Sequence, residues 1–426
     1  MISKPLKKFK VLIRLVVVRR DYATYGLLKN SLEKSGCKVL VVSSLNYTLA
    51  LKYWKPDAVI VHTLTSGETA KKILPSVKIF FLDVEGFRPE DQCHAVFFLK
   101  QKNLIENFSL FLFWGEQVIK EFKKIAPNLD RSKIRIVGNP KLDFIRFLKN
   151  ENIKVKENKK IGILTRFHVL NNHIGRPVIF SLANNPGKYK YTDTQMKTFL
   201  AMIKVVNEIL KNTDFKISIR VHPFEAVEGY ENNLKRWFGQ NNLSRFEIDD
   251  SLDFTDWVRK QNVVITPSSA AITECYLLDI PVINIDKIAK VVEYNKSYDQ
   301  VVTDWFEGAF LPSNIKELIK LLKTRKVKKK NKTMDQMLKK YCDWHKGDYA
   351  TKNSHNHIVN ELNYHQKNFF NISMPFFLIK LLLSIKDRLS FFKNPLLKNF
   401  NYSEHVHKQP STYSKIINKM FGKGSF

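Results

Sequence analysis

The sequence predicts an α/β protein that contains two doubly wound parallel sheets and a helical, basic carboxyl-terminal segment. Short apolar runs typical of strands alternate with amphipathic stretches typical of helices over residues 10–345. A Lys-, Asn- and Glu-rich stretch at residues 150–160 has no apolar periodicity and divides this alternation into two halves. Residues 262–286 then combine a strand, a sharp turn, a helix and a second strand, which is the building unit of a parallel sheet.

The length and charge of the chain limit the classes of protein to which it can belong. Its 426 residues are enough for two or three domains with cores of their own. We predict a first α/β domain over residues 1–150, a second over 151–345, and a basic tail over 346–426. Lys and Arg number 71 against 40 acidic residues, a formal charge of +31, so we expect an anionic partner such as nucleic acid, an acidic membrane face or a phosphorylated substrate.

The cysteines and the apolar runs bear on the cellular compartment. The four cysteines are far apart, and no pair has the spacing of metal ligands or of a disulfide framework, which predicts reduced thiols in a cytosolic protein. No run of about 20 apolar residues is present, so a membrane-spanning helix is not expected. The apolar run after the basic amino terminus is short and contains Arg14, which favours a buried strand over a signal peptide.

The first half predicts one sheet of six strands. The strands are expected at residues 11–18, 39–42, 58–62, 79–82, 110–114 and 134–137, with helices at 25–35 and 117–125. Gly36 follows the first helix, where a glycine commonly ends the last turn. Ligands of such sheets bind outside the carboxyl ends of the strands, so polar side chains at those positions are candidate site residues.

Polar residues follow three strands of the first half. Asp83 and Glu85 come directly after the fourth strand, separated by one valine and followed by a glycine. A carboxylate there would act as a general base on an acceptor hydroxyl; alternatively, the acidic turn only caps the next segment. Trp114 ends the fifth strand, and Asn139 and Lys141 follow the sixth. We assign these three residues to the acceptor side, although Lys141 fits a plain solvated turn equally well.

The second half predicts a further parallel sheet. Its strands are expected at residues 161–164, 215–221, 263–265 and 281–285, with helices at 192–211, 252–260 and 270–278. Thr165 and Arg166 begin a long polar loop, which favours a functional role. His222 ends the next strand, and Arg220 is expected on the same side of that strand. A histidine in this place can donate to a phosphate or a leaving group, although a lone histidine is usually structural.

The turn between the third strand of this sheet and the following helix suits a phosphate group. Ser268 and Ser269 offer two hydroxyl donors beside the amino end of the helix, where main-chain N–H groups point outward. Glu274 lies further along the helix, at a distance from which a carboxylate would reach ribose hydroxyls. The alternative is an ordinary N-capped helix, because serine is also a common capping residue.

The tail contains a Phe- and Leu-rich stretch with flanking cations at residues 369–386. It predicts an amphipathic helix that lies in the interface of an anionic membrane over residues 369–392 and does not cross the bilayer. The alternative is a helix packed on the second domain.

The order of these motifs resembles that of bacterial surface-carbohydrate biosynthesis proteins of the GT-B glycosyltransferase type. It is more distantly similar to GT-B sialyltransferases and Kdo transferases, which carry an acidic-acidic-Gly motif, a His-Pro motif and a Ser-rich motif. The resemblance covers residues 10–345 and rests on these motifs: Asp83-Val84-Glu85-Gly86, Trp114-Gly115, Gly138-Asn139-Pro140-Lys141-Leu142-Asp143, Leu164-Thr165-Arg166-Phe167, Arg220-Val221-His222-Pro223-Phe224-Glu225, and Ser268-Ser269 with Glu274.

The resemblance implies two Rossmann-like domains that face a cleft, and a transfer that needs neither a metal nor a cofactor. It implies that Glu85, or Asp83, is the catalytic base and that His222 binds the nucleotide phosphate. The expected nucleotide-binding set is Thr165, Arg166, Arg220, His222, Ser268, Ser269 and Glu274. Two departures from the family pattern matter. A valine separates the two acids, and another valine interrupts the Arg-Pro-His-Pro-like run at residues 220–223.

The function implied by the resemblance is transfer of a sugar from a nucleotide-sugar donor, with a CMP-linked sugar among the candidates. The acceptor would be a surface glycan or a lipid-linked precursor of capsule or O-antigen, used at the inner face of the cell membrane. A CDP-polyol phosphotransferase and a nucleotide-sugar epimerase of the same fold remain alternatives. A nucleic-acid-binding protein is the alternative from another class, but the basic residues are spread along the chain and no nucleic-acid-binding motif is present.

Overall fold

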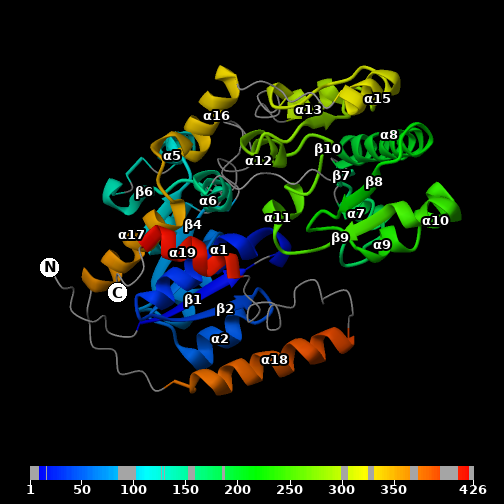
Figure 1. Cartoon of the computed structure of the whole chain (residues 1–426). Helices are drawn as coiled ribbons and strands as arrows, with labels where there is room; N and C mark the ends of the chain where they lie inside the picture. The colour runs from blue at the N-terminus through cyan, green and yellow to red at the C-terminus, as the bar shows by residue number, and fades with distance from the viewer. Residues whose placement is uncertain are drawn as a thin grey trace. The chain divides into compact units, whose positions relative to one another are not determined.

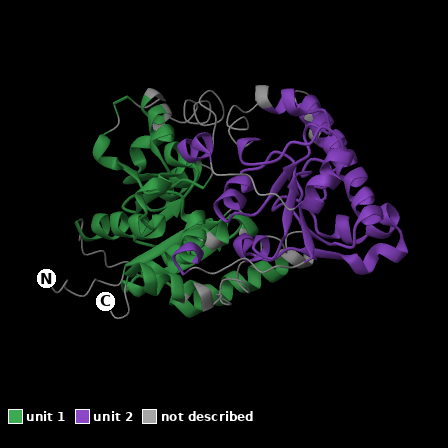
Figure 2. Cartoon of the chain, turned by 45° about the horizontal axis from the view of Figure 1, so that its top comes forward, with its two compact units in different colours: residues 1–147, 338–426 green, residues 148–337 purple. Residues whose placement is uncertain are grey.

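The computed structural model of the chain divides into two compact units, each with its own parallel sheet (Figure 1, Figure 2). Unit 1 comprises residues 1–147 and 338–426, and unit 2 comprises residues 148–337. The structure describes residues 9–15, 17–84, 102–125, 127–128, 130–151, 159–184, 188–298, 306–324, 331–364, 373–393 and 411–421.

The sheet of unit 1 has six parallel strands in the order β2-β1-β3-β4-β5-β6. The strands are β1 (Lys10–Leu15), β2 (Lys38–Ser43), β3 (Ala58–Val61), β4 (Lys78–Leu82), β5 (Leu110–Phe113) and β6 (Ile134–Ile136). All six predicted strands are therefore present. The chain passes from β1 to β2 on one side and continues to β3 on the other side of β1, so the topological switch point lies between β1 and β3.

The amino-terminal helices of unit 1 follow the strands as a doubly wound fold requires. They are α1 (Val18–Lys34), α2 (Tyr47–Trp54), α3 (Leu64–Ile73), α5 (Glu116–Ile125) and α6 (Asp143–Asn150). The sequence predicted a strand up to Val18 and a helix only from Tyr25, and both boundaries were wrong. The strand ends at Leu15, and the carboxylate of Asp21 accepts the N–H of Val17 at 3.2 Å. This hydrogen bond satisfies a donor at the helix start and allows the helix to begin early.

Aromatic rings fill the core of unit 1 on one side of its sheet. Phe81, Phe111 and Phe113 come from β4 and β5, and their rings contact those of Phe108 and Phe122. The ring centroids of Phe111 and Phe122 are 4.8 Å apart. Aromatic rings prefer particular mutual orientations in addition to burying apolar area. A cluster of this kind therefore helps to fix how β4 and β5 pack.

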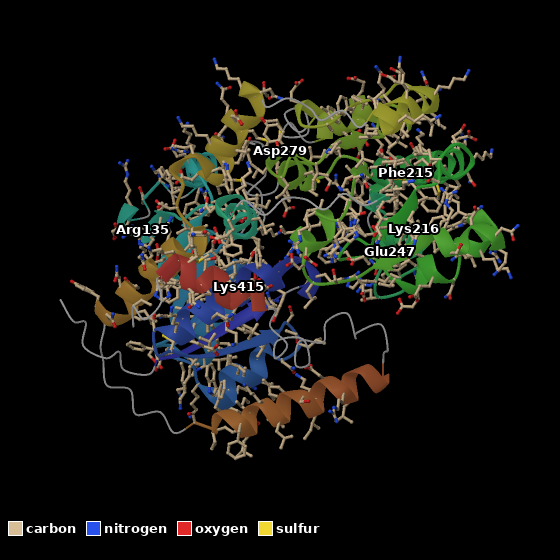
Figure 3. The ribbon with its side chains drawn as sticks, in the orientation of Figure 1. Arg135, Phe215, Lys216, Glu247, Asp279 and Lys415 are labelled. Atoms are coloured by element: carbon tan, nitrogen blue, oxygen red, sulfur yellow. The ribbon has the colours of Figure 1, made fainter. Side chains whose placement is uncertain are left out.

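Four helices in the described part of the chain come from its last hundred residues or so. They are α16 (Lys332–Cys342), α17 (Ala350–Tyr364), α18 (Phe376–Lys393) and α19 (Ser411–Phe421). Helices α17 and α19 both pack against α1, and Figure 3 marks Lys415 on α19. The ring of Tyr413 is fully buried beside Tyr22, at a centroid distance of 5.9 Å. Residues 338–426, which include the whole of the predicted tail, are thus assigned to unit 1.

The start of α17 is capped by a side chain from α6. The carboxylate of Asp143 accepts the N–H of Ala350 at 2.9 Å and that of Thr351 at 2.8 Å. Burial raises the pKa of Asp143 to about 6, although these two N–H donors oppose the rise. These two hydrogen bonds hold the start of α17 on α6. No pattern in the sequence around residue 350 predicts them, because the capping carboxylate is about 200 residues away in the chain.

Helix α18 lies along α2. Its residues Ile379 and Leu383 are buried in the unit 1 core, and Asn46 donates to the carboxylate of Asp387 at 2.7 Å. The main-chain N–H of Met374 donates to the carbonyl of Tyr53 at 2.9 Å. Residues 369–372 of the predicted membrane-interface segment lie outside the described residues. No helix of the described part of the chain is both long and apolar enough to cross a membrane.

The sheet of unit 2 has five parallel strands in the order β11-β10-β7-β8-β9. The strands are β7 (Lys160–Leu164), β8 (Lys216–Arg220), β9 (Phe246–Asp249), β10 (Val263–Thr266) and β11 (Val282–Asn284). The sequence predicted four of them and missed β9. This edge strand is only partly buried, so it has no continuous apolar run to reveal it. Figure 3 marks Glu247 on β9 and Phe215 and Lys216 at the start of β8.

Helices cover the sheet of unit 2. They are α7 (Val178–Asn184), α8 (Tyr189–Asn212), α9 (Glu228–Glu231), α10 (Leu234–Phe238), α11 (Phe254–Val258), α12 (Ala271–Leu277), α13 (Val292–Tyr298) and α15 (Ile315–Thr324). Because β8 and β9 lie on one side of β7 while β10 and β11 lie on the other, the switch point of this sheet lies between β7 and β10.

Candidate functional site

The candidate site of unit 2 lies where three neighbouring strands end. Strand β7 pairs with both β8 and β10, and all three are parallel, so the turns after them meet at one edge of the sheet (Figure 1). Thr165 and Arg166 follow β7, His222 follows β8, and Ser268 follows β10. Four residues of the predicted nucleotide-binding set are therefore neighbours at the switch point.

Two hydrogen bonds join these turns. The hydroxyl oxygen of Thr165 accepts the main-chain N–H of His222 at 2.9 Å. The guanidinium of Arg166 donates to the main-chain carbonyl of Ser268 across the switch point. Arginine has five N–H donors, so this bond engages only part of its donor capacity. The turns after β7, β8 and β10 thus form one connected edge.

The imidazole of His222 has a defined orientation. Its Nδ1 accepts the main-chain N–H of Phe224 at 3.2 Å, which leaves the proton of the neutral ring on Nε2. The ring stacks on that of Phe224, with centroids 5.9 Å apart and planes 29° apart. An Nε2–H donor fixed in this way suits a phosphate oxygen.

A second histidine, His168, stands beside the first and was missed by the sequence-based prediction. Its ring stacks on that of His222, with centroids 5.6 Å apart and planes 25° apart. Burial lowers the pKa of His168 to about 4, and the positive charge of Arg166 lowers it further, so the ring is neutral near pH 7. The available signal was its place in the polar loop directly after β7.

The loops that hold these histidines are tied by a buried carboxylate. Glu225 has no exposed surface, and its two oxygens accept the main-chain N–H of Phe167 and the hydroxyl of Tyr230. Burial raises the pKa of Tyr230 well above its usual value, and the neighbouring Glu225 charge adds to the rise. Glu225 therefore fixes the loop after β7 against the loop after β8.

The two serines of the turn after β10 already have partners within the protein. Ser268 is 1% exposed; its hydroxyl donates to the carboxylate of Asp286, and its N–H lies 3.3 Å from the other oxygen. Asn295 donates to the same carboxylate at 2.8 Å. The hydroxyl oxygen of Ser269 accepts the N–H of Ala271 at 3.3 Å, a local turn contact just before α12, whose N-cap residue is Ala270. In this arrangement the hydroxyl of Ser268 stabilises the turn itself.

The side chain of Arg220, the last residue of β8, contacts the neighbouring strand β9 and the turn that follows it. Its guanidinium forms an ion pair with Asp249 of β9, donates to the hydroxyl of Ser251 at 2.8 Å, and lies 5.9 Å from the ring centroid of Trp257. The structure therefore brings Arg220 to β9 and not to the turn after β10. Glu274 is half-buried on α12.

In unit 1 the structure describes one of the two predicted acids. Asp83 is buried directly after β4, its N–H donates to the carbonyl of Leu112 at 3.0 Å, and its carbonyl accepts the indole N–H of Trp114 at 2.7 Å. Trp114 therefore acts as a support for Asp83. Glu85 lies outside the described residues.

A charged cluster at the switch point of unit 1 was also missed. Asp21, in the first turn of α1, is fully buried and pairs with the guanidinium of Arg20 at 2.5 Å. Burial opposes its ionisation, but Arg20, His62 and Lys141 outweigh burial and lower the pKa of Asp21. His62 follows β3, so the cluster joins the two strands at the switch point. The available signal was Arg19-Arg20-Asp21 directly after the first strand.

The remaining acceptor-side residues lie after β6. The carboxamide oxygen of Asn139 accepts the N–H of Lys141 at 3.0 Å and so caps a short 3₁₀ turn. Lys141 is close enough to Asp21 to act on its charge, as described above. Among the described residues, no group of three His, Cys, Asp or Glu side chains is arranged as metal ligands would be.

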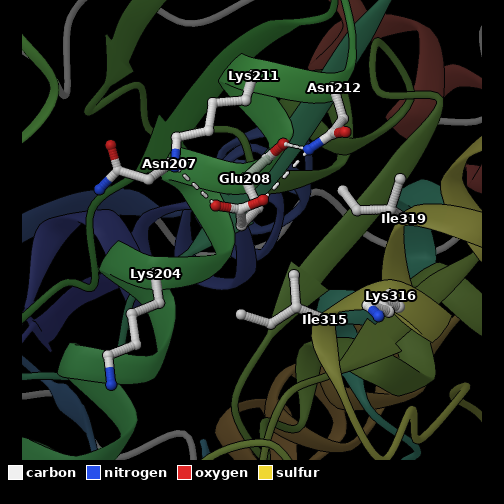
Figure 4. A pocket seen from close by; sticks show the side chains of 8 residues that line it. All are labelled: Lys204, Asn207, Glu208, Lys211, Asn212, Ile315, Lys316 and Ile319. Carbon is white, nitrogen blue, oxygen red and sulfur yellow. Dashed lines mark hydrogen bonds and ion pairs between the residues drawn. The ribbon is translucent and has the colours of Figure 1, made fainter.

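Unit 2 also has a surface groove of about 730 Å³ between α8 and α15 (Figure 4). Glu208 in this groove pairs with Lys211 at 2.9 Å and accepts a hydrogen bond from Asn212 at 3.3 Å. These residues belong to the last turns of α8, just before β8 begins. The groove thus lies toward the amino ends of the strands, away from the candidate site.

Comparison with known proteins gives a fold and no sequence family. No family model matches the sequence, and no curated protein matches it. The structure of S. aureus MnaA with UDP matches 85% of this chain and 100% of its own, with 15% sequence identity and a TM-score of 0.51. A putative UDP-N-acetylglucosamine 2-epimerase from Listeria monocytogenes matches 86% of this chain and 100% of its own, with 14% identity and a TM-score of 0.51. These likenesses show the fold alone: the chain has the GT-B type of architecture, two Rossmann-like α/β units.

Proposed function

We propose that the chain is an enzyme of surface-carbohydrate biosynthesis that binds a nucleotide-linked sugar on unit 2. The observation that carries the proposal is the connected edge of Thr165, Arg166 and His222 at the switch point of a GT-B-type fold. Ligands of open α/β sheets bind at such points. The guanidinium of Arg166 and the Nε2–H of His222 would donate to the diphosphate or monophosphate of the nucleotide.

The proposed reaction is glycosyl transfer. A carboxylate of unit 1, Glu85 or Asp83, would take the proton of an acceptor hydroxyl while the hydroxyl oxygen attacks the anomeric carbon. The bond from that carbon to the nucleotide phosphate breaks, and the donors on unit 2 stabilise the charge that develops on the leaving phosphate. The acceptor would be a glycan or a lipid-linked precursor, reached at the inner face of the cell membrane.

An epimerase reaction at the same site is the second candidate. Two structures of the same fold support it: one contains UDP, and the other is named a putative UDP-N-acetylglucosamine 2-epimerase. Both reactions require a nucleotide at the edge of unit 2, and they differ in the need for an acceptor. Incubation with UDP-N-acetylglucosamine or a CMP-linked sugar, with and without a lipid-linked acceptor, separates them. Formation of an epimeric sugar product without an acceptor would indicate the epimerase, whereas release of the unchanged sugar would be donor hydrolysis.

The binding site itself is tested by calorimetry with UDP, CDP, CMP and GDP. His222→Ala should weaken binding of the preferred nucleotide by about tenfold or more, because it removes one charge-assisted donor. His345→Ala is the matched control, since His345 is a surface residue of unit 1 and its removal should leave the affinity unchanged. Equal affinity of the wild type and His222→Ala, with an intact melting transition, would contradict the proposed site.

A further inference from the structure

Helix α18 presents an unusual outer face. Its residues Phe377, Leu381, Ile385 and Leu389 are 69%, 55%, 48% and 62% exposed. They are spaced four residues apart, so they form one stripe along the helix. We name these four residues the outer stripe. Large apolar side chains that are scattered singly on a surface are ordinary, whereas a continuous stripe marks an interaction surface.

The opposite face of the same helix is fixed to the protein. Ile379 and Leu383 are buried in the unit 1 core, and Asp387 accepts a hydrogen bond from Asn46 at 2.7 Å. Lys386 adds a hydrogen bond to the carbonyl of Leu45 at 2.6 Å. Because the inner face is already engaged, the helix offers only the outer stripe to a partner, and its axis lies along the surface of unit 1.

The charges beside the outer stripe select the partner. The described cationic side chains of α18 are Lys380, Lys386 and Arg388, and its one acidic side chain, Asp387, is buried on the inner face. The ammonium of Lys380 lies 4.4 Å from the ring centroid of Phe376, so part of its stem covers apolar surface. Arg388 is exposed, and Lys380 and Lys386 are half-buried. An apolar stripe on a helix whose described charged side chains are three cations and one buried acid complements a surface of acidic headgroups over acyl chains.

We propose that the outer stripe of α18 docks unit 1 on an anionic phospholipid surface, with the helix parallel to that surface and still bound to α2. The inference rests on the part of the proposed function that brings the protein to a membrane, and it is independent of the reaction. The main-chain carbonyls of Leu45 and Tyr53, which belong to the amino-terminal part of unit 1, accept hydrogen bonds from Lys386 and from the N–H of Met374, and so hold the α18 segment on the unit. The docking surface therefore belongs to the folded unit and is not a detachable tail.

The test is flotation of the full chain with phosphatidylcholine vesicles that contain or lack phosphatidylglycerol. The double variant Phe377→Ser with Leu381→Ser should reduce partitioning into the acidic vesicles by about tenfold or more, with an unchanged melting temperature. The matched control is Ile179→Ser with Leu200→Ser, which removes two exposed apolar side chains from unit 2 and should bind as the wild type does. Wild-type binding should weaken in high salt and on vesicles without phosphatidylglycerol.

A second measurement fixes the orientation of the helix. The fluorescence added by Leu381→Trp should be quenched by brominated lipid, whereas that added by Leu378→Trp, at a less exposed position outside the outer stripe, should be quenched less. Equal flotation of the wild type and the outer-stripe variant would overturn the proposal. So would a concentration-dependent dimer that the variant abolishes, together with no vesicle binding, because the stripe would then contact a second copy of the chain. Nucleotide affinity should be equal in the wild type and in the outer-stripe variant, so a failure of this proposal is distinguishable from a failure of the proposed nucleotide site.

Discussion

Asp83 is held by main-chain hydrogen bonds on both sides, to Leu112 and to the indole of Trp114, so its backbone position is fixed at the end of β4. We expect Glu85→Gln to abolish turnover and to leave donor affinity nearly unchanged, because a base acts on the acceptor hydroxyl and not on the nucleotide. The measurements are steady-state turnover and calorimetric donor binding. A normal rate for Glu85→Gln together with an inactive Asp83→Asn would exchange the two roles, and two active variants would make the acidic turn structural.

His355 on α17 makes the stability of unit 1 dependent on pH. Its Nε2 lies 2.9 Å from the hydroxyl of Ser35, and its ring contacts Phe421 of α19. Burial lowers the pKa of His355 to about 4 from an ordinary value of 6.5. The folded state therefore keeps the ring neutral, and the stability present above pH 6.5 is lost as the pH falls through 6.5 toward 4. At pH 5 the loss should be about 2 kcal/mol.

Chemical denaturation at pH 7.5 and pH 5 measures this effect. His355→Gln should show a smaller loss of unfolding free energy between the two pH values than the wild type, although its stability at pH 7.5 is lower. His168 of unit 2 also has a pKa near 4 and contributes its own acid sensitivity, so the comparison uses the difference between the two proteins. Parallel pH profiles would show that His355 takes up its proton without disturbing the fold.

At this scale part of the arrangement could be predicted from the sequence. That Thr165, Arg166 and His222 are neighbours could be predicted, because residues that follow parallel strands meet at one edge whatever the rest of the chain does. Their role in nucleotide binding stays a prediction. The partner of Arg220 could not be predicted, because Asp249 belongs to a strand that has no apolar run of its own. The stacking of His168 on His222 depends on the path of a long loop, which no local pattern encodes.

At the scale of elements, the close contact between α1 and α19 requires a residue without a side chain at position 26 of α1, and Gly26 meets this requirement. A Cβ added at Gly26 would lie 2.6 Å from the ring of Tyr413, which is buried and packs against Phe144 at 5.0 Å. Gly26→Ala should therefore destabilise unit 1 by about 1–3 kcal/mol through overpacking. In an isolated helix the same change would stabilise by about 1 kcal/mol.

A double-mutant cycle tests this contact by thermal or urea unfolding. With Tyr413→Ala in the background, the ring is absent and Gly26→Ala should become neutral or stabilising, so the two changes couple strongly. Gly36→Ala is a poor control, because the φ of +87° at Gly36 disfavours any side chain. Gly67→Ala is a better comparison: its Cβ would clash with Phe108 in the same unit, and Tyr413→Ala should not relieve that clash. Additive effects of Gly26→Ala and Tyr413→Ala would contradict the packing of α19 on α1.

The strands could be predicted more readily than the helices. Ten of the eleven strands in the described part of the chain were predicted, and nine of these ten are mostly buried, whereas β6 is half-buried along its length. Helices α2 and α3 are short and have both apolar and polar residues without a clear helical periodicity, and neither was predicted. The early start of α1 depends on Asp21, whose role as an acceptor for Val17 only appears once the helix has formed.

For the molecule as a whole, the formal charge of +31 favours binding of anions, and the salt dependence of binding distinguishes nucleic acid from a single nucleotide. Binding of single-stranded RNA or duplex DNA should be measurable at low salt and should fall by orders of magnitude between about 50 and about 200 mM salt. Binding of the preferred nucleotide should change far less over the same range, because few charges are involved. Filter binding and calorimetry in matched buffers measure both. Tight, salt-resistant nucleic-acid binding would favour a function of that class instead.

The packing of α17 and α19 on α1 has a consequence for protein synthesis. Residues 148–337 leave the ribosome as one continuous segment, so unit 2 can fold as soon as it has been made. The face of α1 that α17 and α19 cover stays open until residue 421 has been translated, which takes on the order of ten seconds longer. The first strands to emerge therefore belong to the unit that is completed last, and a nascent chain that stalls after residue 337 exposes an apolar flank to chaperones and proteases.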